Sequence, residues 1–211
     1  MEPKNEKTNL KVLRTKSKLR DSLLTLMREK PIGHITPTEL CRHAQINRNT
    51  FYTYYECPRA LLQSMENDLY EHIRRAVEQS TKHRNSTELL TDIHQVILDN
   101  RELCVVLFSD FGDKAFLDRL ISPIHDQVIA EWKKEKLAVT DQQLNYLYLF
   151  FSCGSISVIQ KWTESGMKQS PKELAEFIVK TSHQGICGHI PAHCRKAMKS
   201  SNPLCKSRRE P

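Results

Sequence analysis

The spacing of apolar residues constrains the fold most strongly, because such residues recur every three or four positions along almost the whole chain. This spacing places apolar side chains on one face of an α-helix, and no segment shows the alternation typical of a half-buried strand. Gly and Pro, which interrupt helices, number only 6 and 9 in 211 residues. The pattern predicts an all-α protein with about nine helices.

Breaks in this pattern divide the chain into four segments. We expect a basic flexible arm at 1–14 and a three-helix helix-turn-helix domain at 15–57. A linker helix and a C-terminal helical domain follow at 58–188, and a basic tail occupies 189–211. Hydrophobic residues make up 39% of the chain, enough for a buried core.

Charge is unevenly distributed along the sequence. Residues 1–60 hold 12 Lys and Arg against 6 Asp and Glu, residues 61–190 hold 14 against 18, and residues 191–211 hold 6 against 1. Attraction to a phosphate backbone requires clustered positive charge, so the N-terminal region favours a nucleic-acid partner. For the tail, a solvated extension is the simpler interpretation. For the arm, a solubilising role and a contact with DNA are equally supported.

Two short helices joined by a three-residue turn are predicted within the basic N-terminal region. Thr36 with Glu39 three residues later forms a capping-box pattern that begins a helix at 37–44. Asn47 is the expected cap of the next helix, at 48–55. This arrangement is typical of a helix-turn-helix.

The same segment has Thr at the start of its first short helix, a small residue before the turn, a Thr-Phe-Tyr-x-Tyr-Tyr run in the second helix, and Leu in the helix after it. These residues are Thr36, Ala44, Thr50, Phe51, Tyr52, Tyr54, Tyr55 and Leu61. Over about fifty residues at the N-terminus, this pattern resembles the DNA-binding domain of the TetR family of bacterial regulators, whose recognition helix reads Thr-Phe-Tyr-x-(Tyr/His)-(Phe/Tyr). Two positions depart from the pattern: Gln45 replaces the usual turn Gly, and Pro58 replaces a Lys, with Arg59 next.

A recognition helix must present one face to the major groove and anchor its other face in the domain. Phe51 and Tyr55, four residues apart, are the predicted anchors. Arg48 near the helix start is suited to bidentate recognition of guanine, and the resemblance implies that the hydroxyls of Tyr52 and Tyr54 contact phosphate. The predicted DNA-binding residues are Thr36, Thr38, Arg48, Asn49, Thr50, Tyr52, Thr53, Tyr54 and Arg59.

The resemblance also implies a homodimer, in which the last two helices of each subunit form a four-helix bundle. Two recognition helices held about 34–36 Å apart fit successive major grooves, which implies a palindromic operator. Packing within one subunit is the alternative explanation of the same apolar stripe. The predicted dimer-contact residues are Tyr148, Phe151, Ser152, Ser155, Ile156, Ile159, Leu174, Phe177, Ile178 and Thr181.

A small-molecule effector is a further partner that the resemblance implies. It would bind among the middle helices and act on DNA binding through the linker helix. Aromatic residues of this kind are more often plain core residues than pocket residues. The candidates are Phe108, Phe111, Phe116, Tyr146, Phe150 and Trp162.

Enzyme signatures are missing from the sequence, which contains no GxSxG, HExxH, P-loop or Gly-rich dinucleotide turn. We therefore expect no catalytic residue and no cofactor. The Cys and His residues between 183 and 194 fit no zinc spacing that we can justify, so no metal site is expected. No long apolar run and no signal peptide are found, which favours a cytoplasmic protein without a membrane partner.

Together these observations predict a sequence-specific, DNA-binding transcriptional regulator. The favoured form is a ligand-responsive repressor that binds a palindromic operator as a dimer. A helical interaction or scaffold protein without DNA binding remains an alternative, since positions 45 and 58 depart from the family pattern. An activator of this fold that works with a coactivator is another.

Overall fold

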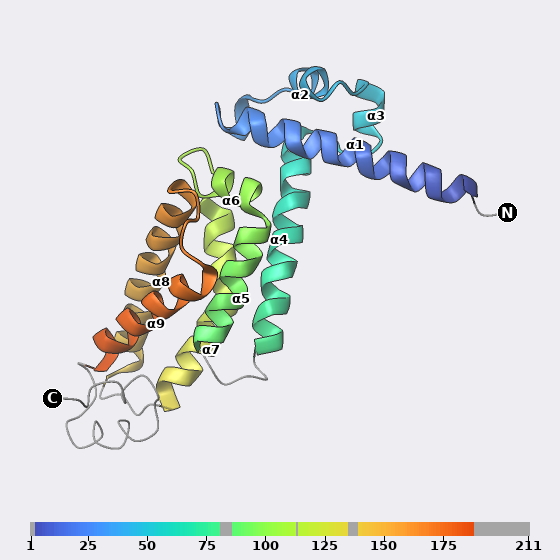
Figure 1. Cartoon of the computed structure of the whole chain (residues 1–211). Coiled ribbons are helices and arrows are strands. Elements are labelled where there is room, and N and C mark those ends of the chain that lie inside the picture. Colours follow the sequence, from blue (N-terminus) through green and yellow to red (C-terminus); the bar gives the residue numbers. More distant parts are fainter. Residues whose placement is uncertain (1–2, 81–85, 113, 135–138, 188–211) are drawn as a thin grey trace. The chain divides into compact units, whose positions relative to one another are not determined.

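The computed structural model describes residues 3–80, 86–112, 114–134 and 139–187. Within these ranges the chain forms nine α-helices, one short 3-10 helix and no strand, which confirms the all-α prediction (Figure 1). The elements are α1 (Pro3–Met27), η1 (Ile32–His34), α2 (Pro37–Ala44), α3 (Arg48–Tyr52), α4 (Pro58–Ser80), α5 (Ser86–Asp99), α6 (Arg101–Leu107), α7 (Lys114–Lys134), α8 (Asp141–Glu164) and α9 (Pro171–Cys187).

The helices belong to two compact units. Unit 1 comprises residues 1–72 and 99–117, and unit 2 comprises residues 73–98 and 118–211. The division falls inside α4, so the predicted linker helix contributes to both units. Unit 1 combines the predicted helix-turn-helix with α6, and unit 2 contains α5, α8 and α9.

The core of unit 1 forms around α1, which packs against α2 and α6. Leu19, Leu23 and Met27 are fully buried on the stripe that helical spacing predicts. Residues 3–14, predicted as a flexible arm, form the first turns of α1 instead. Pro3 suits a first helical position, and the Lys- and Glu-containing sequence after it holds no helix breaker.

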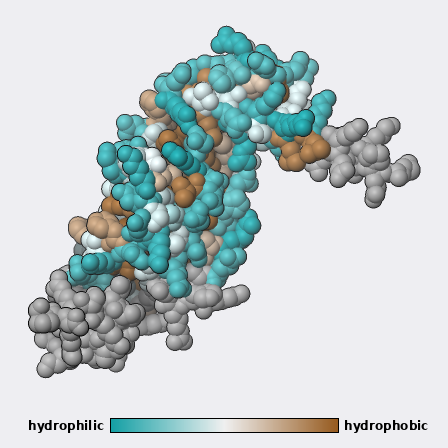
Figure 2. All heavy atoms as spheres, in the orientation of Figure 1, coloured by the Kyte–Doolittle hydropathy of each residue, from teal (hydrophilic) through white to brown (hydrophobic). Residues whose placement is uncertain are grey.

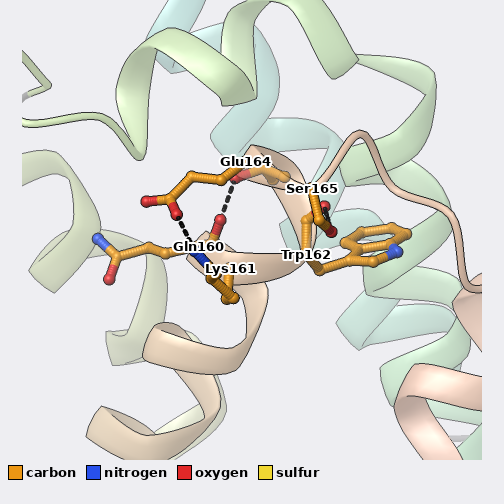
Figure 3. A network of polar contacts seen from close by, with 6 residues as sticks. Gln160, Lys161, Trp162, Glu164 and Ser165 are labelled. Atoms are coloured by element: carbon orange, nitrogen blue, oxygen red, sulfur yellow. Dashed lines mark hydrogen bonds and ion pairs between the residues drawn. The ribbon is translucent and has the colours of Figure 1, made fainter.

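The core of unit 2 contains α5, α8 and α9, of which α8 and α9 are in contact. A complete capping box starts α8, because the Thr140 hydroxyl accepts the Gln143 N–H and the Gln143 side chain accepts the Thr140 N–H. At the other end of α8, the Ser165 hydroxyl donates to the carbonyl of Trp162 over 3.0 Å (Figure 3). The buried Trp162 indole donates to the carbonyl of Gln169 over 2.9 Å, which fixes the turn into α9.

No helix among the described residues is both long and apolar enough to cross a membrane. The predicted basic tail at 189–211 lies outside the described residues, as do His189, His193 and Cys194 of the Cys and His cluster.

Candidate nucleic-acid interface

The start of α2 has the predicted cap. Thr36 is exposed, and its hydroxyl accepts the backbone N–H of Glu39 over 3.2 Å. The Glu39 carboxylate accepts a hydrogen bond from Lys30 Nζ over 2.6 Å. This bond lowers the pKa of Glu39, and burial opposes it. The charges of Lys30 and Arg42 and the backbone N–H of Thr36 lower the pKa further. Thr38 lies exposed in the first turn, so both threonines are available to a phosphate.

The turn between α2 and α3 is left-handed at Gln45, where φ is 55° and ψ is 42°. The N–H of Gln45 bonds to the carbonyl of Arg42, and the N–H of Ile46 bonds to the carbonyl of Cys41. These two bonds form a Schellman motif, in which glycine is usual because a β-carbon costs energy at positive φ. The structure thus confirms that this turn accommodates a side chain where the TetR pattern has Gly.

Helix α3 begins at the predicted cap but ends early. The Asn47 side chain accepts the Asn49 N–H over 2.8 Å, whereas the helix stops at Tyr52 rather than Tyr55. The N–H groups of Tyr54 and Tyr55 both bond to the carbonyl of Phe51 at 3.0 Å, which closes the last turn. Pro58 follows shortly afterwards, and the residue before a proline disfavours helix.

Phe51 anchors this segment in unit 1. Its side chain is 0% exposed, as predicted. Tyr55, the second predicted anchor, is half-buried, and its ring centre lies 6.1 Å from that of Phe51. Burial raises the pKa of Tyr55. The charge of Arg20 lowers this pKa and the charge of Asp68 raises it, and both effects are smaller than that of burial. The side chains of Phe51 and Tyr55 therefore anchor the recognition segment to the core of unit 1.

The outer side of the segment carries the predicted base-reading and phosphate-contacting residues. Arg48, Asn49, Tyr52 and Thr53 are exposed, and Arg59 is exposed in the first turn of α4. Thr50 and Tyr54 are half-buried. All nine predicted DNA-binding residues lie in unit 1, and their donors and hydroxyls are of the types that contact base edges and phosphates.

Two cations lie over the tyrosines of this surface. The Arg48 guanidinium lies 5.8 Å from the centre of the Tyr52 ring, and its Nη2 donates to the Tyr52 hydroxyl over 3.3 Å. The hydroxyl raises the pKa of the Arg48 guanidinium. Lys16 of α1 lies 5.5 Å from the centre of the Tyr54 ring. Sequence spacing predicts the first contact, because residues i and i+4 share a helix face, but not the second.

The six effector-pocket candidates come from both units. Three of them, Phe108, Phe111 and Phe116, belong to unit 1, and the others belong to unit 2. In unit 2 Trp162 is buried, whereas Tyr146 and Phe150 are among the large exposed hydrophobic side chains. Phe108 and Phe116 are buried in unit 1, as Trp162 is in unit 2.

His94, beside Trp162, is a buried polar residue that sequence reasoning missed. Its ring centre lies 6.0 Å from that of Trp162. Its Nδ1 lies 3.4 Å from the carbonyl oxygen of Pro171, which can only accept, so Nδ1 carries the proton. Burial lowers the pKa of His94 to about 4, although the contact with Pro171 raises it. The sequence signal that could have indicated this buried residue is a single histidine beside the apolar residues of α5.

The predicted dimer-contact residues of α8 face their own unit more than solvent. The ring centre of Tyr148 lies 4.6 Å from that of His125, and the ring centre of Phe151 lies 6.0 Å from that of Trp132. Of the ten predicted residues, only Phe177 and Thr181 are exposed, while Leu174 and Ile178 are buried and the six on α8 are half-buried.

A neighbouring face of α8 carries the exposed apolar side chains instead. Tyr146, Leu149 and Phe150 are exposed there, as is Phe177 on α9. Figure 2 shows hydrophobic residues at the surface where Figure 1 draws α8. Because α8 is apolar on more than one stripe, sequence spacing does not distinguish the inward face from the outward one.

Comparison with known proteins supports a regulator of the TetR type. Residues 84–184 match the TetR-type family described as "Transcriptional regulator C-terminal region". The uncharacterized HTH-type transcriptional regulator YxbF of Bacillus subtilis is 26% identical over an alignment of 124 positions, and the match covers 52% of this chain and 32% of YxbF. The chain thus spans about a third of the length of this curated relative.

Solved structures share the fold along most of the chain. A TetR transcriptional regulator from Streptococcus agalactiae is 22% identical with a TM-score of 0.59, and the match covers 84% of this chain and 98% of that one. The dihydroxyacetone kinase operon activator DhaS is 17% identical with a TM-score of 0.58 and the same coverage. The chain thus shares the fold of these solved regulators, and its C-terminal region matches a TetR-type family of transcriptional regulators.

Proposed function

We propose that the chain is a non-catalytic, sequence-specific DNA-binding regulator whose segment Arg48–Tyr54 enters the major groove. The observation that carries the proposal is the two-sided construction of this segment. On its inner side the side chain of Phe51 is completely buried, while on its outer side Arg48 and Tyr52 are exposed. A helix anchored on one side and bearing hydrogen-bond donors on the other suits major-groove recognition.

Charge supports the same proposal. Residues 1–60 hold 12 Lys and Arg against 6 Asp and Glu, and two of these cations, Arg48 and Lys16, lie over tyrosine rings of the proposed interface. Positive charge close to the recognition segment attracts the phosphate backbone and releases its counterions. Affinity should therefore fall steeply as salt rises.

The test is binding to duplexes selected from a random pool by the purified protein. We expect the selected duplex to bind at least about 1,000-fold more tightly than random duplex at moderate salt, in line with specific regulators. Arg48→Ala should reduce that ratio, whereas Lys180→Ala, at an exposed lysine on α9, is the matched control and should not. Equal affinity of the wild-type protein for selected and random duplexes would refute the proposal.

A homodimer on a palindromic operator is the form that we propose. The exposed apolar face formed by Tyr146, Leu149, Phe150 and Phe177 is the proposed contact surface. Exposed large apolar side chains mark interaction sites, and a second copy presents the same side chains about a two-fold axis. This assignment shifts the contact from the stripe of Tyr148 to its neighbour.

The oligomeric state tests this surface, and the chain offers a matched pair of leucines. Leu149 on α8 and Leu13 on α1 are 59% and 56% exposed. Leu149→Glu should convert the dimer to monomer in sedimentation velocity, because a charge buried in a contact is costly. Leu13→Glu should leave the dimer intact. A monomeric wild-type protein, or a Leu149→Glu dimer of unchanged stability, would contradict the proposed surface.

We further propose that a small effector acts on unit 2 to change DNA binding. His94 and Trp162 form the buried polar and aromatic pair of this unit, and among the described residues His94 Nε2 has no hydrogen-bond partner. An effector that binds there should change the tryptophan fluorescence of the wild type and of Trp132→Phe, in which Trp162 is the remaining tryptophan, but not that of Trp162→Phe. Affinity for the selected duplex should change over the same concentration range.

The direction of regulation has two candidates. Repression is our first proposal, since a dimer occupying an operator blocks transcription directly. Activation is the second, because DhaS, which shares the fold, is named as an operon activator. Transcript levels of the genes beside the selected operator, with and without the protein, distinguish the two.

A further inference from the structure

Arg48 and Tyr52 form a pair on the exposed side of α3. They are four residues apart on a five-residue helix, so their side chains lie on the same face. Arg48 Nη2 donates to the Tyr52 hydroxyl over 3.3 Å, and the guanidinium carbon lies 5.8 Å from the ring centre. Both the hydroxyl and the ring of Tyr52 therefore hold the guanidinium.

The polar groups of Asn47, Asn49 and Thr53, which neighbour this pair, bond to one another rather than to Arg48. The Asn49 N–H bonds to the Asn47 side chain over 2.8 Å, and the Thr53 hydroxyl donates to the Asn49 carbonyl over 2.9 Å. These contacts stabilise the backbone of the short helix, and none of them involves the Arg48 guanidinium. The Tyr54 ring lies under Lys16, which comes from α1. Tyr52 is thus the tyrosine that contacts Arg48.

A tyrosine hydroxyl has one proton to donate and two lone pairs to accept. While one lone pair accepts from Arg48, the O–H remains able to donate to a phosphate oxygen. A phosphate held in this way fixes the hydroxyl, and the hydroxyl in turn fixes the guanidinium. Arginine recognises guanine through two parallel hydrogen bonds, which depend on the orientation of the guanidinium plane.

We propose that Tyr52 is a positioning residue that orients Arg48 for base recognition, so that one hydroxyl links the phosphate contact to base reading. The inference rests on the proposed function and names the specificity device of the same site. Its consequence is that removing the Tyr52 hydroxyl changes which sequences bind, in addition to how tightly they bind.

The experiment measures affinity for the selected duplex and for variants with each base pair changed in turn. Wild type, Arg48→Ala, Tyr52→Phe and the double variant are compared, with Tyr54→Phe as the matched loss of a tyrosine hydroxyl. Arg48→Ala should lose about 5- to 100-fold discrimination at one or two base pairs. Tyr52→Phe should lose about 3-fold or more at those same base pairs, and the double variant should match Arg48→Ala. Tyr54→Phe should weaken all duplexes by one common factor.

A second measurement uses the protein without DNA. Nitrogen NMR of the Arg48 guanidinium should show faster rotation about its Nε–Cζ bond in Tyr52→Phe than in wild type, and no change in Tyr54→Phe. Unchanged rotation in Tyr52→Phe overturns the pairing itself.

The two proposals fail in different ways. If wild type discriminates between duplexes but Tyr52→Phe weakens every duplex equally, Tyr52 does not position Arg48 and only this inference is overturned. If wild type does not discriminate at all, the proposed function fails, whatever the NMR result.

Discussion

Protonation of His94 should make the stability of the protein depend on pH. Burial lowers the pKa of His94 to about 4 in the folded protein, against 6.5 in the unfolded chain. Between these values the unfolded chain takes up a proton that the folded protein excludes, so the free energy of unfolding falls as pH falls. The stabilisation is complete above pH 6.5 and is lost progressively down to pH 4.

The size of the effect follows from the difference in pKa. Each unit corresponds to about 1.4 kcal/mol, so the total loss is about 3 kcal/mol at pH 4. At pH 5.5 the loss is already about 1.4 kcal/mol, because only the unfolded chain is largely protonated there. A change of this size is a large fraction of the stability of a typical domain.

Urea unfolding followed by circular dichroism at pH values from 7.5 to 5 measures this dependence. His94→Asn removes the titrating group and keeps a donor for the Pro171 carbonyl, so the difference from wild type isolates His94 from other titrating groups. His43→Asn, at an exposed histidine of α2, controls for the loss of an imidazole elsewhere. The reasoning is refuted if His94→Asn retains the wild-type dependence on pH over this range.

Three further predictions concern positions whose burial or backbone geometry the structure defines. Gln45→Gly should raise the free energy of unfolding by about 0.5–1 kcal/mol, because glycine relieves the positive φ of 55°. Phe51→Ala should lower it by about 3–5 kcal/mol, since the ring is completely buried; urea unfolding checks both. In the native protein, Cys57 should react with a thiol reagent while Cys104 reacts only after unfolding, because Cys104 is buried and burial raises its pKa to about 12. Mass spectrometry of the labelled peptides locates the reacted thiols, and equal labelling of both would contradict the buried position.

Local rules predicted the helix-turn-helix well. The caps at Thr36 and Asn47 and the anchor Phe51 follow from interactions within a few residues, and the structure confirms them. The end of α3 was predicted three residues too late, because apolar spacing continues to Tyr55 although the backbone closes at Phe51.

Features that depend on distant contacts were beyond the sequence. Nothing local distinguishes the stripe of α8 that contains Tyr148, which contacts His125, from the stripe of Leu149, which is exposed. The pairing of Lys16 with Tyr54 joins α1 to the recognition segment and has no local signature. The burial of His94 depends on α5 meeting the turn between α8 and α9, which periodicity alone does not reveal.

The most direct test of the central claim is methylation interference on the selected duplex. Methylation of guanine N7 blocks the major-groove edge that an arginine such as Arg48 would contact. If the segment Arg48–Tyr54 reads the major groove from two subunits, methylation should prevent binding at two clusters of guanines about 10–11 base pairs apart, and Arg48→Ala should lose that sensitivity. Binding that tolerates guanine methylation throughout the duplex, with full affinity and selectivity retained, would contradict the account.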